Sequence, residues 1–285
     1  MKRILSLTLF LAVFLSACRA TVTPTPMPAA TQPPTLAPTA VPPTATPEPR
    51  TLTVFAAASL TDAFTEIGKA FESVNPNVTV TFNFAGSQAL RTQIEQGAAA
   101  DVFASANATE MNTLVTESLV TKDVPQIFLT NKLIVILPAN NLAKVQSLQE
   151  LSRSGLKLVL GDTTVPIGKY ARQILDNISK DPSYGSDYGT KVLANVVSNE
   201  TDVKQVVAKV QLGEADAGIV YISDSIAAPD LKTIEIPNNL NVIAKYPIAP
   251  LIKSADPDLA TQFIAYILSA DGQATLKKWG FGPIK

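Results

Sequence analysis

Three short segments of the chain combine small residues with a side chain that can begin a helix. They are residues 56–62 (AAASLTD), 84–88 (FAGSQ) and 198–203 (SNETDV). The spacing predicts Ser59 and Ser87 as N-cap residues, and Asp62, three residues after Ser59, would complete a capping box. The first N–H groups of a helix are unpaired and carry partial positive charge, so such ends bind anions without any lysine. An ordinary N-cap is the alternative interpretation of each serine.

The composition excludes several kinds of chemistry. The chain has 285 residues, no histidine and a single cysteine, Cys18. Histidine-based acid–base catalysis, histidine-ligated metals and an intrachain disulfide are therefore excluded. A hydrolase would need a serine–lysine or two-carboxylate site, and no such motif stands out, so we expect no enzyme. The net charge of −1 also disfavours nucleic acid as a partner.

The N-terminus has the pattern of a processed lipoprotein. Lys2 and Arg3 precede an apolar run over residues 4–17, which is too short for a membrane span of about 20 residues. The small residues before Cys18 resemble a lipobox, in which the chain is cut and the cysteine lipidated. We therefore expect a signal peptide over 1–17 and a lipidated Cys18, with a buried structural cysteine as the alternative.

Residues 18–50 are expected to be a tether. Ten of the 32 residues from 19 to 50 are prolines and eight are threonines. Proline removes main-chain donors and favours extended polyproline conformations, so this composition predicts neither helix nor sheet. Such a segment would hold a folded part away from a membrane. A tether would also suit an adhesive surface domain, but the anion-binding patterns of residues 56–62, 84–88 and 198–203 would then be coincidental.

Residues 51–285 alternate strand-like and helix-like patterns, which predicts an α/β fold. One arrangement occurs twice, at 97–103 (GAAADVF) and 213–221 (GEADAGIVY). Each follows a helical pattern with a glycine, alanines, an aspartate and a strand. Two similar α/β lobes on either side of a cleft would explain the repetition; chance similarity of two helix-to-strand connections is the alternative.

The same segments resemble those of the bacterial molybdate-binding proteins that serve ABC importers. Residues 53–60 (TVFAAASL) are similar to their opening strand and first binding loop, and residues 84–87 (FAGS) to their second loop. Further similar segments follow in the family's order: 97–106, 161–162, 165–171, 201–203, 218–224 and 269–281. The resemblance covers essentially all of residues 51–285.

The resemblance implies an α/β class II periplasmic-binding-protein fold, with mixed sheets flanked by helices and a ligand cleft between two lobes. The first lobe would comprise 51–130 and 247–285, and the second 131–246. The implied ligand-binding residues are Ser59 and Ser87 from the first lobe, Ile167 and Val203 through their backbone N–H groups, and Tyr221 through its hydroxyl. The molybdenum would be held through its oxygens, so neither a directly coordinated metal nor a cofactor is expected.

The resemblance further implies an extracytoplasmic, lipid-anchored monomer that binds molybdate or tungstate and delivers it to ABC permease subunits. A site made only of donors suits a fully ionised oxyanion and disfavours phosphate, which keeps a proton near neutral pH. Another small anion is the alternative, either sulfate or an organic acid, for which Arg91 and Arg172 could supply a guanidinium. Two departures concern the second lobe: the 163–164 connection is one residue short, and the bulky Ile167 stands where a small residue is common.

Overall fold

Two five-stranded mixed sheets form the framework of the protein. The computed structural model describes residues 48–284, and the expected signal peptide, Cys18 and most of the tether lie outside them. In the first sheet β1 is parallel to β2 and β3, whereas β10 is antiparallel to β3 and β4. The strand order is β2 (Val78–Ala85), β1 (Arg50–Ala57), β3 (Val102–Ala104), β10 (Ala244–Pro250) and β4 (Gln126–Asn131).

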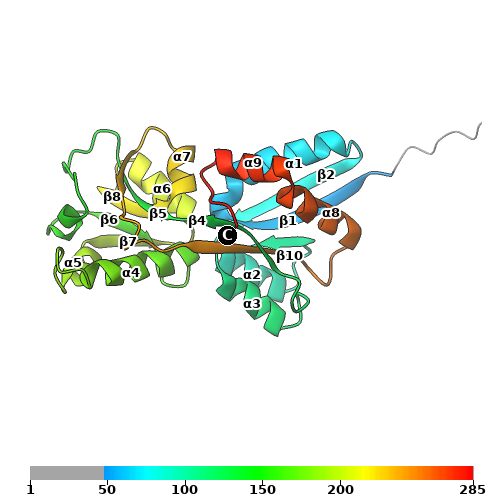
Figure 1. The fold of residues 1–285 in the computed structure, drawn as a ribbon, viewed down its shortest axis with the longest axis horizontal. Helices are drawn as coiled ribbons and strands as arrows, with labels where there is room; N and C mark the ends of the chain where they lie inside the picture. Colours follow the sequence, from blue (N-terminus) through cyan, green and yellow to red (C-terminus); the bar gives the residue numbers. More distant parts are fainter. Residues whose placement is uncertain (1–47, 285) are drawn as a thin grey trace, which may run out of the picture. The chain divides into compact units, whose positions relative to one another are not determined.

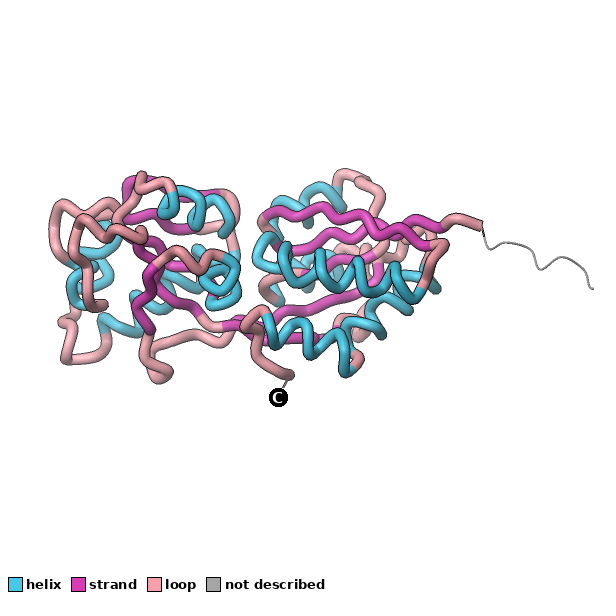
Figure 2. Tube along the Cα trace, turned by 90° about the horizontal axis from the view of Figure 1, so that it is seen from above, coloured by secondary structure: helices cyan, strands magenta, loops and turns pink. Residues whose placement is uncertain are grey.

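The second sheet repeats this arrangement with other segments of the chain. Its β6 is parallel to β7 and β8, and β5 is antiparallel to β8 and β9. The order is β7 (Val196–Glu200), β6 (Leu158–Gly161), β8 (Ala217–Tyr221), β5 (Leu133–Leu137) and β9 (Lys232–Glu235). All five residues of β5 are buried, as expected of an uninterrupted apolar strand. We call each sheet with its helices a lobe (Figure 2).

Helices cover both faces of each sheet (Figure 1). On the first sheet, one face carries α1, α8 and α9 and the other α2 and α3; on the second, one face carries α6 and α7 and the other α4 and α5. The first-lobe helices are η1 (Ala58–Leu60), α1 (Thr61–Val74), α2 (Ser87–Glu95), α3 (Ala108–Thr116), α8 (Pro257–Leu268) and α9 (Ala270–Lys278). The second-lobe helices are η2 (Gln149–Ser152), α4 (Pro166–Ser179), α5 (Tyr188–Ala194), α6 (Val203–Gln211) and α7 (Ile222–Ala227).

Amphipathic sequence patterns explain how the helices dock. The apolar residues of α1 recur every three or four positions, and that stripe is buried against the first sheet; its members are Ala63, Phe64, Ile67 and Phe71. The valines of α6 bury the corresponding face in the second lobe. Near the C-terminus, Ser269 separates α8 from α9, and its side chain accepts a hydrogen bond from Gly272 N and caps α9.

The repeated sequence pattern forms the same structural element in both lobes. Gly97 and Gly213 both adopt positive φ, of 90° and 72°, in the turns that follow α2 and α6. Asp101 Oδ2 then accepts a hydrogen bond from Thr53 N, and Asp216 Oδ2 accepts one from Lys157 N, both at 2.8 Å. Asp101 therefore ties the start of β3 to β1, and Asp216 ties the start of β8 to the residue before β6. The expectation of two similar lobes is confirmed.

The chain passes between the sheets twice. Lys132 alone separates β4 from β5, and residues 236–243 separate β9 from β10. Because β10 pairs within the first sheet, Ala244–Tyr246 lie with the first lobe, whereas the sequence-based boundary placed them in the second. At the other end, Arg50, which was expected to be the last residue of the tether, already pairs with Val78 in β1.

Candidate functional site

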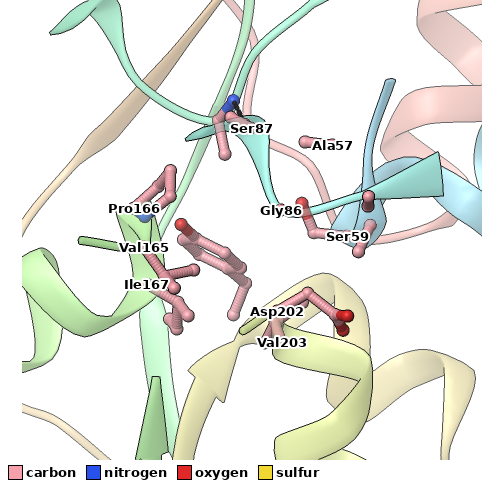
Figure 3. Close-up of a pocket in the computed structure, with 13 residues that line it drawn as sticks. Ala57, Ser59, Gly86, Ser87, Val165, Pro166, Ile167, Asp202 and Val203 are labelled. Carbon is pink, nitrogen blue, oxygen red and sulfur yellow. Dashed lines mark hydrogen bonds between the residues drawn. The ribbon is translucent and has the colours of Figure 1, made fainter. Parts of the chain in front are cut away.

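One pocket between the lobes brings together all five residues that the sequence analysis singled out. Its first-lobe wall includes Ser59 and Ser87 with small neighbours on either side, and its second-lobe wall includes Ile167, Val203 and Tyr221 (Figure 3). The pocket encloses about 210 Å³ of space, part of it open to solvent. Alanines 57, 58, 85 and 106 and Gly86 complete the first wall, so the main chain is accessible there.

Parallel strands place the two serines at one sheet edge. Ala57 and Ala85 are register partners at the ends of β1 and β2, so the connections after them are neighbours. Ser59 lies in the single turn η1 and is 5% exposed, and Ser87 is the first residue of α2 and 1% exposed. Both serines are therefore held at the pocket wall by the ends of adjacent strands.

The predicted N-caps and capping box of the first lobe are wrong. The turn η1 is inserted between β1 and α1, so Leu60 occupies the N-cap position of α1 and Ser59 makes no cap. Gly86 is the N-cap residue of α2, one position before Ser87. Neither serine hydroxyl is used by its own helix. Ser59 Oγ lies 2.9 Å from the Tyr246 hydroxyl, and Ser87 Oγ accepts a hydrogen bond from Ala106 N at 3.0 Å.

The second lobe directs main-chain donors at the pocket. Ile167 and Val203 lie in the first turns of α4 and α6, and among the described residues their N–H groups have no acceptor. Asp202 is the N-cap of α6, and its carboxylate accepts hydrogen bonds from the main chain and side chain of Gln205. The acidic group at this wall is thus engaged by its own helix.

The bulk of Ile167 is accommodated by a glycine. A Cβ added at Gly161 would lie 2.6 Å from Ile167 Cγ2, so the isoleucine side chain occupies space that any other residue at 161 would fill. The short connection before α4 forms a tight turn in which Asp162 Oδ1 accepts hydrogen bonds from the Thr164 N–H and hydroxyl. The hydrogen bond from the Thr164 N–H, followed by that from the Thr164 hydroxyl, lowers the pKa of Asp162.

Tyr221 brings a buried hydroxyl to the second-lobe wall of the pocket. It ends β8, is 1% exposed, and its hydroxyl has no hydrogen-bond partner within residues 48–284. Burial, followed by the neighbouring Tyr246, raises the pKa of Tyr221 well above its ordinary value, so the phenol remains a donor. A buried hydroxyl without a partner costs about 1–3 kcal/mol, which a ligand oxygen would relieve.

Ion pairs join the lobes on two sides of the pocket. On one side, Lys204 of α6 lies 2.6 Å from Asp62 of α1 and 3.5 Å from the buried Asp224. On the other, Lys169 of α4 lies 3.0 Å from Glu110 of α3. The sequence analysis did not find these pairs, because partners about 60 and 140 positions apart leave no local pattern.

The pKa values of Lys204 and Asp224 depend on each other. Burial raises the pKa of Asp224 to about 6, against the attraction of Lys204. Burial would lower the pKa of Lys204, but Asp224 and Asp62 together outweigh it and raise that pKa. Lys204 therefore stays charged and bridges a carboxylate of each lobe. A side-chain hydrogen bond adds to this connection, since Gln88 Nε2 donates to the main-chain Thr201 O across the interface at 2.9 Å.

The two candidate arginines do not reach the pocket. Arg172 donates to the carbonyls of Gly161 and Gly168 and to Asn199 Oδ1. Arg91 forms ion pairs with Glu95 and Glu110. Both guanidinium groups are thus committed to the protein itself, and neither lines the pocket to receive an organic carboxylate.

The described residues contain neither a metal-binding cluster nor a membrane-spanning helix. Between residues 48 and 284, no three acidic, histidine or cysteine side chains converge in a way that could hold a metal ion. Over the same residues, no helix has the length and apolar character needed to cross a bilayer.

Comparison with known proteins identifies the family. The model of the bacterial extracellular solute-binding proteins matches residues 52–282. The chain belongs to this family. It is therefore a solute-binding protein rather than an enzyme, and its two mixed sheets flanked by helices confirm the expected two-lobed periplasmic-binding-protein fold.

Three relatives illustrate the similarity. The molybdate-binding protein ModA of Mycobacterium tuberculosis is 40% identical over 233 residues, which cover 81% of this chain and 84% of that protein. The putative ABC transporter substrate-binding lipoprotein YvgL of Bacillus subtilis is 31% identical and covers 81% and 86%. A solved structure, the substrate-binding domain of a putative molybdenum ABC transporter from Clostridium difficile, is 32% identical, with a TM-score of 0.62 and coverage of 83% and 100%.

Proposed function

We propose that this protein captures molybdate, and also tungstate, in the pocket between its lobes and delivers it to an ABC importer. The observation that carries the proposal is the buried hydroxyl of Tyr221, which has no partner among the described residues and lies in the same pocket as Ser59 and Ser87. The N–H groups of Ile167 and Val203, which have no acceptor within residues 48–284, complete a set of neutral donors from both lobes. The names of the relatives from M. tuberculosis and C. difficile support the same ligand.

The donor set favours a fully ionised tetrahedral anion. Every oxygen of such an anion accepts hydrogen bonds, and three hydroxyls and two main-chain N–H groups can donate them. A phosphate that keeps one proton needs an acceptor, and among the described residues the carboxylate that lines the pocket, that of Asp202, is turned to Gln205 of its own helix. Leaving that proton unpaired costs about 1–3 kcal/mol. The same logic does not exclude sulfate, so size must separate sulfate from molybdate.

Binding to both walls would stabilise the arrangement in which the lobes are in contact. A ligand that touches both lobes binds this form more tightly than an open one and shifts the population towards it. Permease subunits would then recognise the loaded protein. No observation favours an organic acid, because Arg91 and Arg172 are committed elsewhere.

The site residues are tested by titrating the whole chain, purified in detergent, with sodium molybdate, tungstate, sulfate and phosphate. Molybdate and tungstate should raise the melting temperature by mass action, and sulfate and phosphate should not. Tyr221→Phe keeps the ring and removes the hydroxyl, so its molybdate affinity should fall by about 1.5–3 kcal/mol. An equal response to sulfate would make this a sulfate-binding protein, and no response to any of the four would reject an oxyanion site.

The proposal places the protein outside the cytoplasm as a monomer anchored through a lipid on Cys18. Residues 1–17 carry the signal-peptide pattern, and the B. subtilis relative is named a lipoprotein. Cys18→Ala should move the protein from the membrane pellet to the soluble fraction, because the lipid would be its hydrophobic anchor. Retention of Cys18→Ala in the pellet would contradict the anchor and leave the ligand unaffected.

A further inference from the structure

The two pocket serines are held in different ways. Ser87 Oγ accepts from Ala106 N, and since a main-chain N–H can only donate, Ser87 keeps its own proton for another acceptor. Ser59 Oγ lies 2.9 Å from the Tyr246 hydroxyl, where either oxygen could be the donor. Ser59 has its proton free for the pocket only if Tyr246 donates.

The surroundings of Tyr246 determine the direction of that hydrogen bond. Tyr246 is fully buried on β10, and within residues 48–284 Ser59 Oγ is the hydrogen-bond partner of its hydroxyl. If Ser59 donated to Tyr246, the buried phenol proton would be left without an acceptor, which is unfavourable away from water. Burial raises the pKa of Tyr246 well above its ordinary value, so the phenol keeps that proton. The proton of Tyr246 is therefore directed to Ser59 Oγ.

We propose that Tyr246 is a positioning residue that sets the anion selectivity of the pocket: it donates to Ser59 Oγ and thereby turns the Ser59 proton towards the bound anion. This rests on the proposed function, because the anion is the one that the five pocket residues bind. With Tyr246 in place, both serines present protons to the ligand. Without it, Ser59 Oγ can turn and accept a hydrogen bond from a protonated anion such as phosphate.

The arrangement couples the pocket to a segment that joins the lobes. Tyr246 lies on β10, the strand that returns to the first lobe after residues 236–243. The ring of Tyr246 also packs against that of Tyr221, with centroids 5.8 Å apart. The orientation of Ser59 is thus fixed by a residue 187 positions away rather than by its own loop.

The test compares Tyr246→Phe with wild type in the whole chain, purified in detergent and titrated calorimetrically with sodium molybdate and with inorganic phosphate. Molybdate affinity should fall about fivefold to tenfold, the range expected for one lost hydrogen bond. Phosphate affinity should not fall, so the molybdate-to-phosphate affinity ratio should drop by at least the same factor.

Tyr188→Phe is the matched control. Tyr188 is also buried, at 1% exposure, and its hydroxyl donates at 2.6 Å to the carbonyl of Leu148, which, unlike Ser59, does not line the pocket. Its loss should lower the melting temperature without changing the affinity ratio. If Tyr246 has only a structural role, Tyr246→Phe and Tyr188→Phe should both lower the melting temperature and leave the molybdate-to-phosphate affinity ratio unchanged.

An unchanged ratio in Tyr246→Phe, or an equal change in Tyr188→Phe, overturns the proposal. If Tyr246→Phe does not fold, Ser59→Ala tests the same proton: a hydroxyl that donates to the anion is lost, so the ratio should again fall, and an unchanged or higher ratio there rejects the proposal equally. If the wild-type protein binds no molybdate, both this inference and the proposed function are wrong. If it binds molybdate but the variants leave the molybdate-to-phosphate affinity ratio unchanged, this inference alone is wrong.

Discussion

The two lobes present the same strand-to-helix arrangement to the pocket but supply different donors. In the first lobe, β1 and β2 lead into η1 and α2, and the donors are the hydroxyls of Ser59 and Ser87. In the second, β6 leads into α4 and β7 into α6, and the corresponding positions offer the main-chain N–H groups of Ile167 and Val203. A repeated fold therefore does not require repeated side-chain chemistry.

The difference separates two ways of holding a donor. A main-chain N–H in the first turn of a helix is fixed by the helix and needs no further partner, so the side chain of Val203 is free to join the core. A hydroxyl rotates, and its direction depends on neighbours such as Ala106 and Tyr246. The first lobe should therefore be sensitive to changes of side chain, and the second to changes of backbone geometry.

The largest expected effect comes from pushing the lobes apart. A Cβ at Gly86 would lie 2.4 Å from Thr201 O of the second lobe, so Gly86→Ala prevents the two walls from meeting. Overpacking of this kind costs about 3 kcal/mol, which corresponds to a loss of molybdate affinity of roughly 100-fold by calorimetry. Small-angle scattering should also show no compaction when ligand is added.

Gly68→Ala is the matched control for that substitution. Its Cβ would lie 2.7 Å from the Phe82 ring within the first lobe. It should lower the melting temperature and leave most of the affinity intact. Comparable affinities for Gly86→Ala and Gly68→Ala would show that contact between the lobes is not needed for binding.

The next effect compares the two kinds of donor directly. Ser87→Ala removes a hydroxyl from the pocket and should cost about 1.5–3 kcal/mol of molybdate binding, the range for a hydrogen bond to a charged group. Val203→Ala keeps the N–H group and shortens a buried side chain, so it should reduce stability while affinity changes much less. Both are measured by calorimetry and thermal unfolding. A greater loss of affinity in Val203→Ala than in Ser87→Ala would contradict the division between the lobes.

The smallest effect concerns the ion pairs beside the pocket. Lys204→Met removes the link between Asp62 and Asp224, and we expect it to weaken molybdate binding by about 1 kcal/mol, roughly fivefold, because partly exposed pairs contribute little. Lys209→Met is the control on the same helix, since Lys209 pairs with Glu200 inside the second lobe and is similarly exposed. The effect of Lys204→Met should shrink at high salt, and equal affinities in the two variants would rule out a role for the link in closure.

The sequence was informative wherever local pattern decides local structure. The alternation of strand-like and helix-like patterns predicted the α/β fold, and the twice-repeated glycine and aspartate predicted the matching lobes. It did not show where α1 begins, because η1 lies between strand and helix and replaces the capping box. Sheet pairing likewise moved the second crossing before Ala244, since strand partners are set by contacts that one segment does not reveal.

The sequence by itself determined that the pocket would be built without histidine or a disulfide, and its resemblance pointed to five residues that line one pocket. Only the tertiary structure decided how those residues are held. The partner of Ser59 lies on β10 and that of Ser87 follows β3, while Lys204 meets Asp62 across 142 positions. Helical and strand periodicities reflect neighbours along the chain. The direction of a hydroxyl proton and the pairing of distant charges depend on neighbours in space, which exist only once both lobes have folded and met.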